Sequence, residues 1–385
     1  MHKELKFLKA PFLIKSCIAL LAFNCLTMPI VKGQVISHNS ILNLDFLQYG
    51  AEVPKELLSA KTAVLIDDQM PSLGRPTWQT LAQEAHTTFH RLGIDAVAYY
   101  DLNVVLSGTP VARSFAQEIK NRGILYALIL HRSITVAQDT AYTLTLGKIS
   151  EQDLFFEAGQ PAFRLHNNQL AALMQSMVRA VSSSGLERAN FLILEKPEFF
   201  QKTNIFAARR FENYNPDLKL DRLAVPLFEE RKTPAKTPSG MSGDEVSYLV
   251  ERENQKVMAA NERLREVMTQ YPFASGPVSQ DITEAEMRRD GYLFILQHVY
   301  GKASTVSDIL QYNFESTEQV LTSTTIVGGD TITKALPTEE AVYKFYVKHL
   351  PTGEVFLGSQ WDADTTWEAA LENFINNLKF ALKVQ

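Results

Sequence analysis

The ten residues RGILYALILH at 122–131 and the ten residues RDGYLFILQH at 289–298 follow one pattern. Each begins with an arginine, passes a glycine, continues as an apolar run and ends in a histidine. Glycine is the usual residue just past the end of a helix, and an unbroken apolar run is typical of a strand buried on both faces. The repetition indicates that the chain contains one structural unit twice.

The segments around the first stretch alternate between strand and helix signals. An apolar run predicts a buried strand at 61–66, whereas apolar positions three and four apart predict a helix from Pro76-Thr77 to Gly93. The same reasoning predicts a strand at 94–102, a helix that begins at Thr109-Pro110, the strand at 124–131, an antiparallel hairpin from 142–149 and 154–159, and a closing helix at 170–181.

A similar order follows the break at 182–185. We expect a strand at 190–194, then an edge strand or loop at 220–228, since its internal proline cannot donate a ladder hydrogen bond. The remaining expected elements are a helix at 251–271, a short helix that begins at Thr283, the strand at 292–298, a hairpin from 341–350 and 354–361, and a last helix that begins near Thr365.

The predicted fold class is therefore α/β, with two tandem copies of a helix-strand-hairpin-helix unit on a mixed sheet. We expect the first copy at 34–185 and the second at 186–385, with an exposed linker or insertion at about 231–244. Two copies predict two lobes with a groove between them, and such grooves are common sites for ligands and partners.

The first 33 residues have the order of a secretory signal. Lysines precede a short apolar stretch, and a small residue, Gly33, lies where cleavage is expected. We therefore expect an exported protein of the periplasm or cell envelope; retention of residues 1–33 as a membrane anchor is the alternative. This segment holds five lysines and one glutamate, so its removal takes the net charge from −5 to about −9. That balance argues against nucleic acid or an anionic membrane as the main partner.

Both cysteines of the chain, Cys17 and Cys25, lie inside the expected signal. The rest of the chain then has no disulfide, thiolate metal site or cysteine nucleophile. Lipidation is disfavoured because Ser16 and Asn24 precede the two cysteines in poor context. No later segment approaches the ~18 apolar residues of a membrane helix, so we expect no transmembrane segment after cleavage.

The second copy resembles a type of envelope domain over roughly its last hundred residues. The matching segments are Gly291–His298, the hairpin Tyr343–Leu357 with Pro351-Thr-Gly-Glu354 at its turn, and the helix Thr365–Leu382. They are similar to the amino-terminal domain of the Tol-system translocation protein and to units of the curli-secretion and penicillin-binding-protein activator lipoproteins. The resemblance implies a non-catalytic envelope protein that docks other proteins. The lack of a lipid-attachment cysteine, a propeller and membrane-spanning hairpins argues against anchoring and pore formation.

Acidic side chains follow two predicted strands of the first copy. Asp67 and Asp68 come directly after one strand, and Asp101 ends the next. If these strands are parallel, the three carboxylates lie at one sheet edge, where a ligand or a hard cation such as magnesium or calcium could bind. We favour the alternative that the aspartates cap the following turns and helices. Glu195-Lys196 is expected at the corresponding place in the second copy, so no shared metal site is predicted.

Four histidines and one tryptophan are the other candidates. His86 and His90 lie four residues apart on a helix, as in some zinc sites, but no glutamate or third ligand accompanies them. His131 and His298 end equivalent strands and could contact a ligand or sense pH, although polar strand ends are the interpretation we favour. Trp361 flanks a turn and could anchor a sugar or peptide at the surface.

The sequence contains no phosphate-binding loop, dinucleotide-binding motif or hydrolase nucleophile motif. We expect no cofactor and no metal. Our leading hypothesis is a non-catalytic interaction or assembly factor whose partner is another envelope protein. The second hypothesis is a periplasmic small-ligand-binding or metal-dependent hydrolytic protein that uses Asp67, Asp68 and Asp101.

Overall fold

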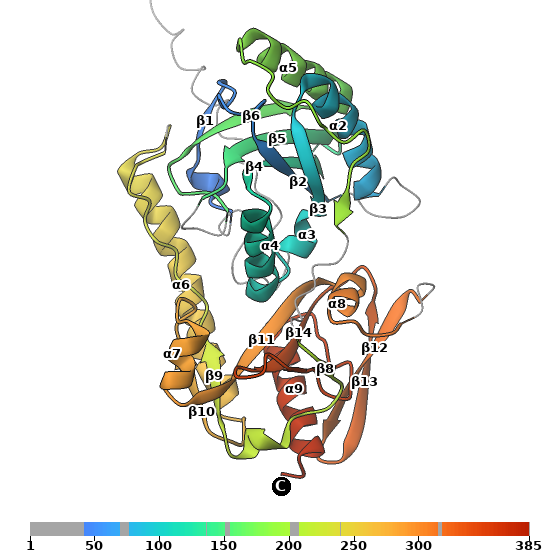
Figure 1. Ribbon diagram of the computed structural model, residues 1–385. Coiled ribbons are helices and arrows are strands. Elements are labelled where there is room, and N and C mark those ends of the chain that lie inside the picture. Colours follow the sequence, from blue (N-terminus) through green and yellow to red (C-terminus); the bar gives the residue numbers. More distant parts are fainter. Residues whose placement is uncertain are drawn as a thin grey trace, which may run out of the picture.

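The computed structural model describes residues 42–69, 77–135, 137–150, 155–200, 208–238, 240–314 and 318–384. The chain has a mixed α/β fold and forms two lobes, one above the other in Figure 1, each built on its own mixed sheet. The expected signal at 1–33 lies outside the described residues. Among the helices that are described, none is both long and apolar enough to cross a membrane.

The first lobe contains a seven-stranded sheet. Its elements are β1 (Gln48–Gly50), β2 (Lys61–Asp68), α2 (Trp78–Leu92), β3 (Asp95–Asp101), α3 (Leu102–Val105), α4 (Thr109–Asn121), β4 (Ile124–Ile134), β5 (Thr140–Lys148), β6 (Pro161–Asn167), α5 (Leu170–Ser183) and β7 (Phe199–Phe200). The strand order is β1-β6-β5-β4-β2-β3-β7, with β2 parallel to β3 and β4, and β5 antiparallel to β4 and β6. Helices α2 and α5 cover one face, and α3 and α4 cover the other.

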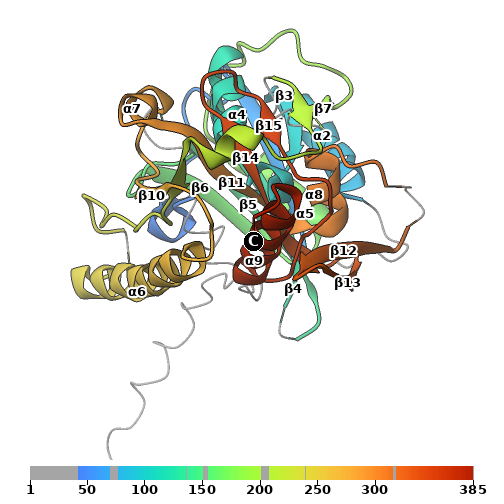
Figure 2. The same ribbon diagram turned by 90° about the horizontal axis from the view of Figure 1, so that it is seen from below.

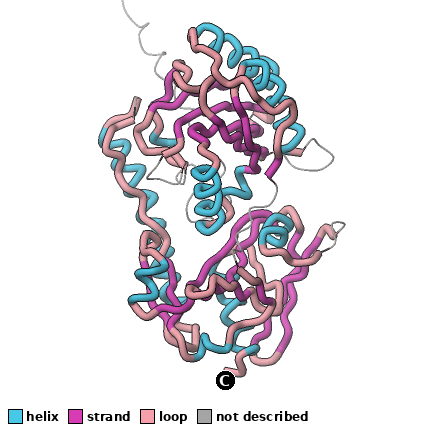
Figure 3. Tube along the Cα trace, in the orientation of Figure 1, coloured by secondary structure: helices cyan, strands magenta, loops and turns pink. Residues whose placement is uncertain are grey.

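The second lobe contains a six-stranded sheet and a separate hairpin. Its elements are β8 (Arg210–Phe211), β9 (Arg222–Pro226), α6 (Gly243–Met268), β10 (Ser275–Val278), α7 (Glu284–Arg289), β11 (Tyr292–Lys302), α8 (Ala303–Ile309), β12 (Val320–Val327), β13 (Asp330–Pro337), β14 (Ala341–His349), β15 (Val355–Phe356) and α9 (Trp367–Ala381). The order is β10-β9-β11-β14-β15-β8. Helices α6 and α9 cover one face, and α7 packs on the other. Figure 3 shows the alternation of helix and strand in both lobes.

The two sheets have the same topology. The order β6-β5-β4-β2-β3 corresponds strand for strand to β15-β14-β11-β9-β10, with the same directions. Even an irregularity repeats, because β4 skips one residue against β2 between Ile124 and Tyr126, and β11 skips one against β9 between Tyr292 and Phe294. The chain therefore contains one unit twice, as the repeated stretches predicted.

Three predicted elements are wrong. Residues 190–194 are irregular and mostly exposed, and the strand of the second unit that corresponds to β2 is β9. This strand lies between β10 and β11 and not at an edge, because Pro226 is its last residue and interrupts no ladder inside the strand. Residues 155–159 are irregular too, and the hairpin partner of β5 is β6. The hairpin β12–β13 was not predicted.

The segment after β9 is packed at residues 228–231, whereas most of the described residues between 232 and 244 are exposed, in agreement with the exposed linker or insertion expected at about 231–244. Two asparagines of α6 hold its backbone: Asn261 bonds to both the amide and the carbonyl of Phe228, and Asn254 does the same for Arg231. The Arg231 guanidinium lies 3.7 Å from the centroid of the Phe46 ring and pairs with Glu253 of α6, and Phe46 packs against Val246 and Val250, so α6 is tied to the first lobe. Helix α6 thus runs beside both lobes (Figure 1), while β12–β13 lies on the opposite side of the body (Figure 2).

The lobes contact each other where β9 is short. Strand β2 accompanies β4 as far as Asp68, but β9 ends at Pro226 and leaves the following residues of β11 unpaired on that side. A turn of the first lobe takes this place: the Tyr300 amide donates to the Ser107 carbonyl at 2.5 Å. At Gly108 a Cβ atom would lie 2.7 Å from the His298 carbonyl oxygen, so the close approach requires glycine.

Candidate functional site

The carboxyl ends of β2 and β4 bring Asp67 and His131 together. These residues are partners in the parallel register, and Asp67 Oδ2 lies 2.7 Å from His131 Nδ1. Asp67 is fully buried and His131 is 4% exposed. Gln69 Nε2 donates to the same Oδ2 at 3.4 Å, whereas Asp67 Oδ1 has no hydrogen-bond partner in the described part of the chain. The sequence placed both residues at strand ends but did not predict the pair.

The other two candidate aspartates, Asp68 and Asp101, are used inside the fold. Asp68 forms an ion pair with Arg132 across β2 and β4. Asp101 accepts a hydrogen bond from the Asn103 amide at 2.9 Å and caps α3, so the cap interpretation is confirmed there. Burial raises the pKa of Asp101 above its usual value. Within the described residues, no three His, Cys, Asp or Glu side chains are placed to share a metal ion.

His131 and His298 do not occupy equivalent positions, contrary to the prediction. When the lobes are matched on the skipped residues of β4 and β11, Val299 corresponds to His131, and His298 corresponds to Leu130. Successive residues of a strand face opposite sides of the sheet, so the two histidines lie on opposite faces. The one-residue offset comes from Asp290, which the second stretch has between its arginine and its glycine.

His298 is half-buried on the face of the second sheet that α6 and α9 cover. Its ring centroid lies 5.3–6.3 Å from those of Phe228, Tyr343 and Phe345. Burial lowers the pKa of His298 to about 4, so the ring is neutral at neutral pH.

The ring of His298 borders a cavity of about 50 Å³ between the lobes, the interlobe cavity. It lies at the carboxyl ends of β9 and β10, the edge where α/β sheets commonly bind ligands, and beside the middle of β11. The amino-terminal part of α4, with Thr109 and Arg113, closes it from the first lobe. This position agrees with the groove that the duplication led us to expect.

Two further candidates are buried. Trp361, predicted as a surface anchor, is 5% exposed and packs at 5.0 Å against Tyr312, so that prediction is wrong. His86 Nδ1 lies 2.7 Å from the Tyr99 hydroxyl, and its Nε2 lies 3.0 Å from the Leu194 carbonyl. Burial lowers the pKa of His86. Because both ring nitrogens have protein partners, His86 cannot join His90 in a zinc site without losing them.

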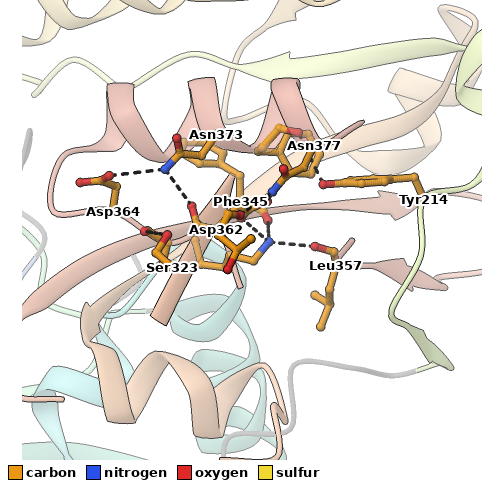
Figure 4. A network of polar contacts seen from close by, with 12 residues as sticks. Tyr214, Ser323, Phe345, Leu357, Asp362, Asp364, Asn373 and Asn377 are labelled. Atoms are coloured by element: carbon orange, nitrogen blue, oxygen red, sulfur yellow. Dashed lines mark hydrogen bonds and ion pairs between the residues drawn. The ribbon is translucent and has the colours of Figure 1, made fainter. Parts of the chain in front are cut away.

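A buried lysine of β14 was missed by sequence reasoning. Lys344 Nζ donates to the carbonyls of Phe345 and Leu357 at 2.9 and 2.8 Å and pairs with Asp362 Oδ1 at 2.8 Å (Figure 4). Burial alone would lower the pKa of Lys344, but the charge of Asp362 raises it. Two carbonyls accept hydrogen bonds from the ammonium, and the Asp362 carboxylate supplies the opposite charge. A single lysine within the apolar run AVYKFYV was the available signal.

The same network attaches the β12–β13 hairpin to the second lobe. Asn377 of α9 donates to Asp362 Oδ2 at 3.1 Å and exchanges hydrogen bonds with the Thr324 carbonyl and the Ile326 amide (Figure 4 shows the residue). Ser323 donates to the Ala363 carbonyl at 2.7 Å. Because these side chains make their contacts with one another and with the backbone of the second lobe, the role we infer for this network is structural.

An apolar segment of the first lobe faces solvent. In the docking segment, residues 191–194, the exposed fractions are 80% for Phe191, 96% for Leu192 and 47% for Leu194. Its backbone is nevertheless fixed, because the Asn190 side chain donates to the Gly93 carbonyl at 3.2 Å and His86 contacts the Leu194 carbonyl. This is the segment that sequence reasoning assigned to a strand.

Comparisons of the chain with protein-family models, with curated proteins and with solved structures find no match. Function therefore has to be inferred from the geometry of the molecule itself.

Proposed function

We propose that this protein is an exported, non-catalytic interaction factor of the cell envelope and that it binds another envelope protein through the docking segment. The observation that carries this proposal is the exposure of Phe191 and Leu192 on a backbone held at both ends. Contiguous exposed apolar side chains mark binding surfaces, and a segment that is already ordered loses little conformational entropy on binding.

Two further observations support a docking role. The polar atoms of His86, Asp68 and Asp101, which had been candidates for chemistry, make contacts inside the first lobe. The resemblance of the second unit to envelope domains that dock other proteins points in the same direction. Export rests on the signal-like order of residues 1–33.

The test replaces Phe191 and Leu192 together with serine. Both side chains are exposed, so the change in unfolding free energy should stay within about 0.5 kcal/mol. Leu220→Ser is the matched control, since Leu220 is 84% exposed but lies in the second lobe. Cross-linking in envelope extract should yield a defined partner with the wild type and the control. The yield of this partner should be at least about tenfold lower with the double variant.

Equal capture by all three proteins would contradict the docking segment. Sedimentation of the purified chain separates a further outcome: if the wild type self-associates and the double variant does not, the partner is a second copy and not another envelope protein.

The second candidate function is small-ligand binding or metal-dependent hydrolysis at the strand-end aspartates, and one observation favours it. Asp67 is fully buried, yet its Oδ1 has no hydrogen-bond partner in the described residues. Alanine at Asp67, Asp68 and Asp101 together should then abolish any metal content or hydrolytic activity that the purified wild type has. Unchanged metal content and activity would remove this candidate.

A further inference from the structure

We propose that the interlobe cavity binds a small organic carboxylate. The cavity volume of about 50 Å³ corresponds to the space of roughly three or four water molecules. It therefore suits a head group with a short hydrocarbon tail and excludes a nucleotide or a sugar chain. This inference is independent of the docking segment, which lies on the first lobe and does not line the cavity.

The charge of the cavity selects an anion. Arg113 is the only charged side chain among the described residues that line it, although the whole chain carries a net charge of −5. Arg113 is the fifth residue of α4 and lies one turn from the start of this 13-residue helix, where no side chain from the described residues caps the backbone amides. The unpaired amides at a helix start carry partial positive charge, which adds to the guanidinium.

Arg113 has further N–H donors besides the one that bonds to Gln280. Its Nη2 donates to the Gln280 carbonyl at 2.6 Å, which holds the side chain at the cavity, and the structure shows no other partner for it in the described part of the chain. A guanidinium presents five N–H donors in a fork that matches a carboxylate. Arg113 can therefore keep its bond to Gln280 and still bind a carboxylate.

The rest of the lining favours a carboxylate with a hydrocarbon tail over inorganic phosphate. Phe228, Leu264 and Met287 form apolar walls, which would desolvate a doubly charged phosphate without supplying further cations. His298 also borders the cavity and is neutral at neutral pH, so its ring offers one N–H donor without a second charge. One cation, one neutral donor and apolar walls match a short-chain acid such as butyrate.

Isothermal titration calorimetry of the full chain with butyrate tests the proposal. Saturable binding is expected for the wild type, and Arg113→Gln should weaken it at least about tenfold because a charge-assisted hydrogen-bond pair is lost. Arg179→Gln on α5 is the matched control and should bind as the wild type does, since that exposed helical arginine does not line the cavity. The Phe191→Ser, Leu192→Ser double variant should also keep full affinity.

The proposal would be overturned by the absence of saturable heat with butyrate, by equal affinity in Arg113→Gln, or by equal binding of butylamine and butanol. Arg113-dependent binding of inorganic phosphate without binding of butyrate would also overturn it. Arg113→Lys keeps the positive charge and so shows whether weaker binding comes from loss of the charge or from damage to the fold. It should retain part of the affinity, and both arginine variants should melt within a few degrees of the wild type because Arg113 makes only one hydrogen bond in the described structure.

Discussion

The two lobes share one topology but complete their sheets in different ways. In the first lobe β2 runs beside β4 to its end, and Asp67 and His131 form a buried pair there. In the second lobe β9 stops at Pro226, and the first lobe supplies the turn that contacts β11. The shared apolar pattern specifies the strand order. The length of β9 and a few polar residues decide whether the sheet of a lobe is completed within that lobe or by contact with the other lobe.

The buried charges of the lobes also differ. Matching of the sheets places Lys344 of β14 where β5 has Thr143. Thr143 needs only one hydrogen bond, at 3.0 Å from His166 Nδ1, but the ammonium of Lys344 needs Asp362 from the segment before α9. The second lobe thus fixes its carboxy-terminal segment and its hairpin through a charge that the first lobe does not have. Three predictions test this comparison.

The largest effect is expected for Lys344→Met. The substitution leaves Asp362 as an unpaired, fully buried carboxylate, so the unfolding free energy should fall by about 3–5 kcal/mol. Urea unfolding followed by tryptophan fluorescence measures this loss, since Trp361 and Trp367 are in the second lobe.

The double variant Lys344→Met, Asp362→Leu is the control. It removes both charges, and we expect it to recover most of the loss, because apolar replacement of a buried ion pair is often neutral. If the double variant were as unstable as the single one, the role of Lys344 would be packing and not the ion pair.

The sequence predicts those parts of the fold that depend on the spacing of apolar residues and on the positions of glycines. The helices α2, α4 and α5 and the strands β2 to β5 and β11 lie close to the predicted ranges. The prediction failed at 190–194, because the apolar content of a segment does not show whether a position in a sheet is available for it. In the second sheet, the position beside β11 is occupied by β9, which lies further along the chain. Strand β9 was misjudged because the rule against proline holds inside a strand and not at its last residue.

The candidate site was harder to predict for a different reason. The Asp67–His131 pair depends on register between strands 64 residues apart, and a shift of one residue would turn His131 to the other face. The same single-residue sensitivity made His298 look equivalent to His131. The partner of Lys344 could not be inferred either, since Asp362 lies in an irregular segment without periodicity.

A second, smaller effect is expected for Gly108→Ala, which tests whether the second lobe relies on the first. The added Cβ would lie 2.7 Å from the backbone oxygen of His298, which cannot move without disturbing β11. We expect a loss of about 1–3 kcal/mol in unfolding free energy and a larger radius of gyration in small-angle scattering. Gly243→Ala, at the start of α6 with open space around it, is the control. Unchanged scattering and stability in Gly108→Ala would mean that the lobes are joined mainly by α6.

The smallest effect concerns His298, which stands where the first lobe has Leu130. Its pKa is about 4 in the folded protein against 6.5 for the free side chain, so the unfolded chain takes up a proton at a higher pH than the folded one. The stabilisation from neutral His298 is present above pH 6.5 and is lost as the pH falls toward 4. Because the ring keeps some exposure to the interlobe cavity, we expect a loss of about 1–2 kcal/mol between pH 7 and 4.5.

Urea unfolding in carboxylate-free buffers at several pH values measures this slope. His298→Leu gives the second lobe the residue of the first, and the difference in stability between wild type and variant should change by that amount across the pH range. The sign is fixed, since acid must favour the variant. If the two proteins kept a constant difference from pH 7 to 4.5, the His298 ring would be protonated equally in the folded and unfolded states, and the two lobes would not differ in their response to acid at this position.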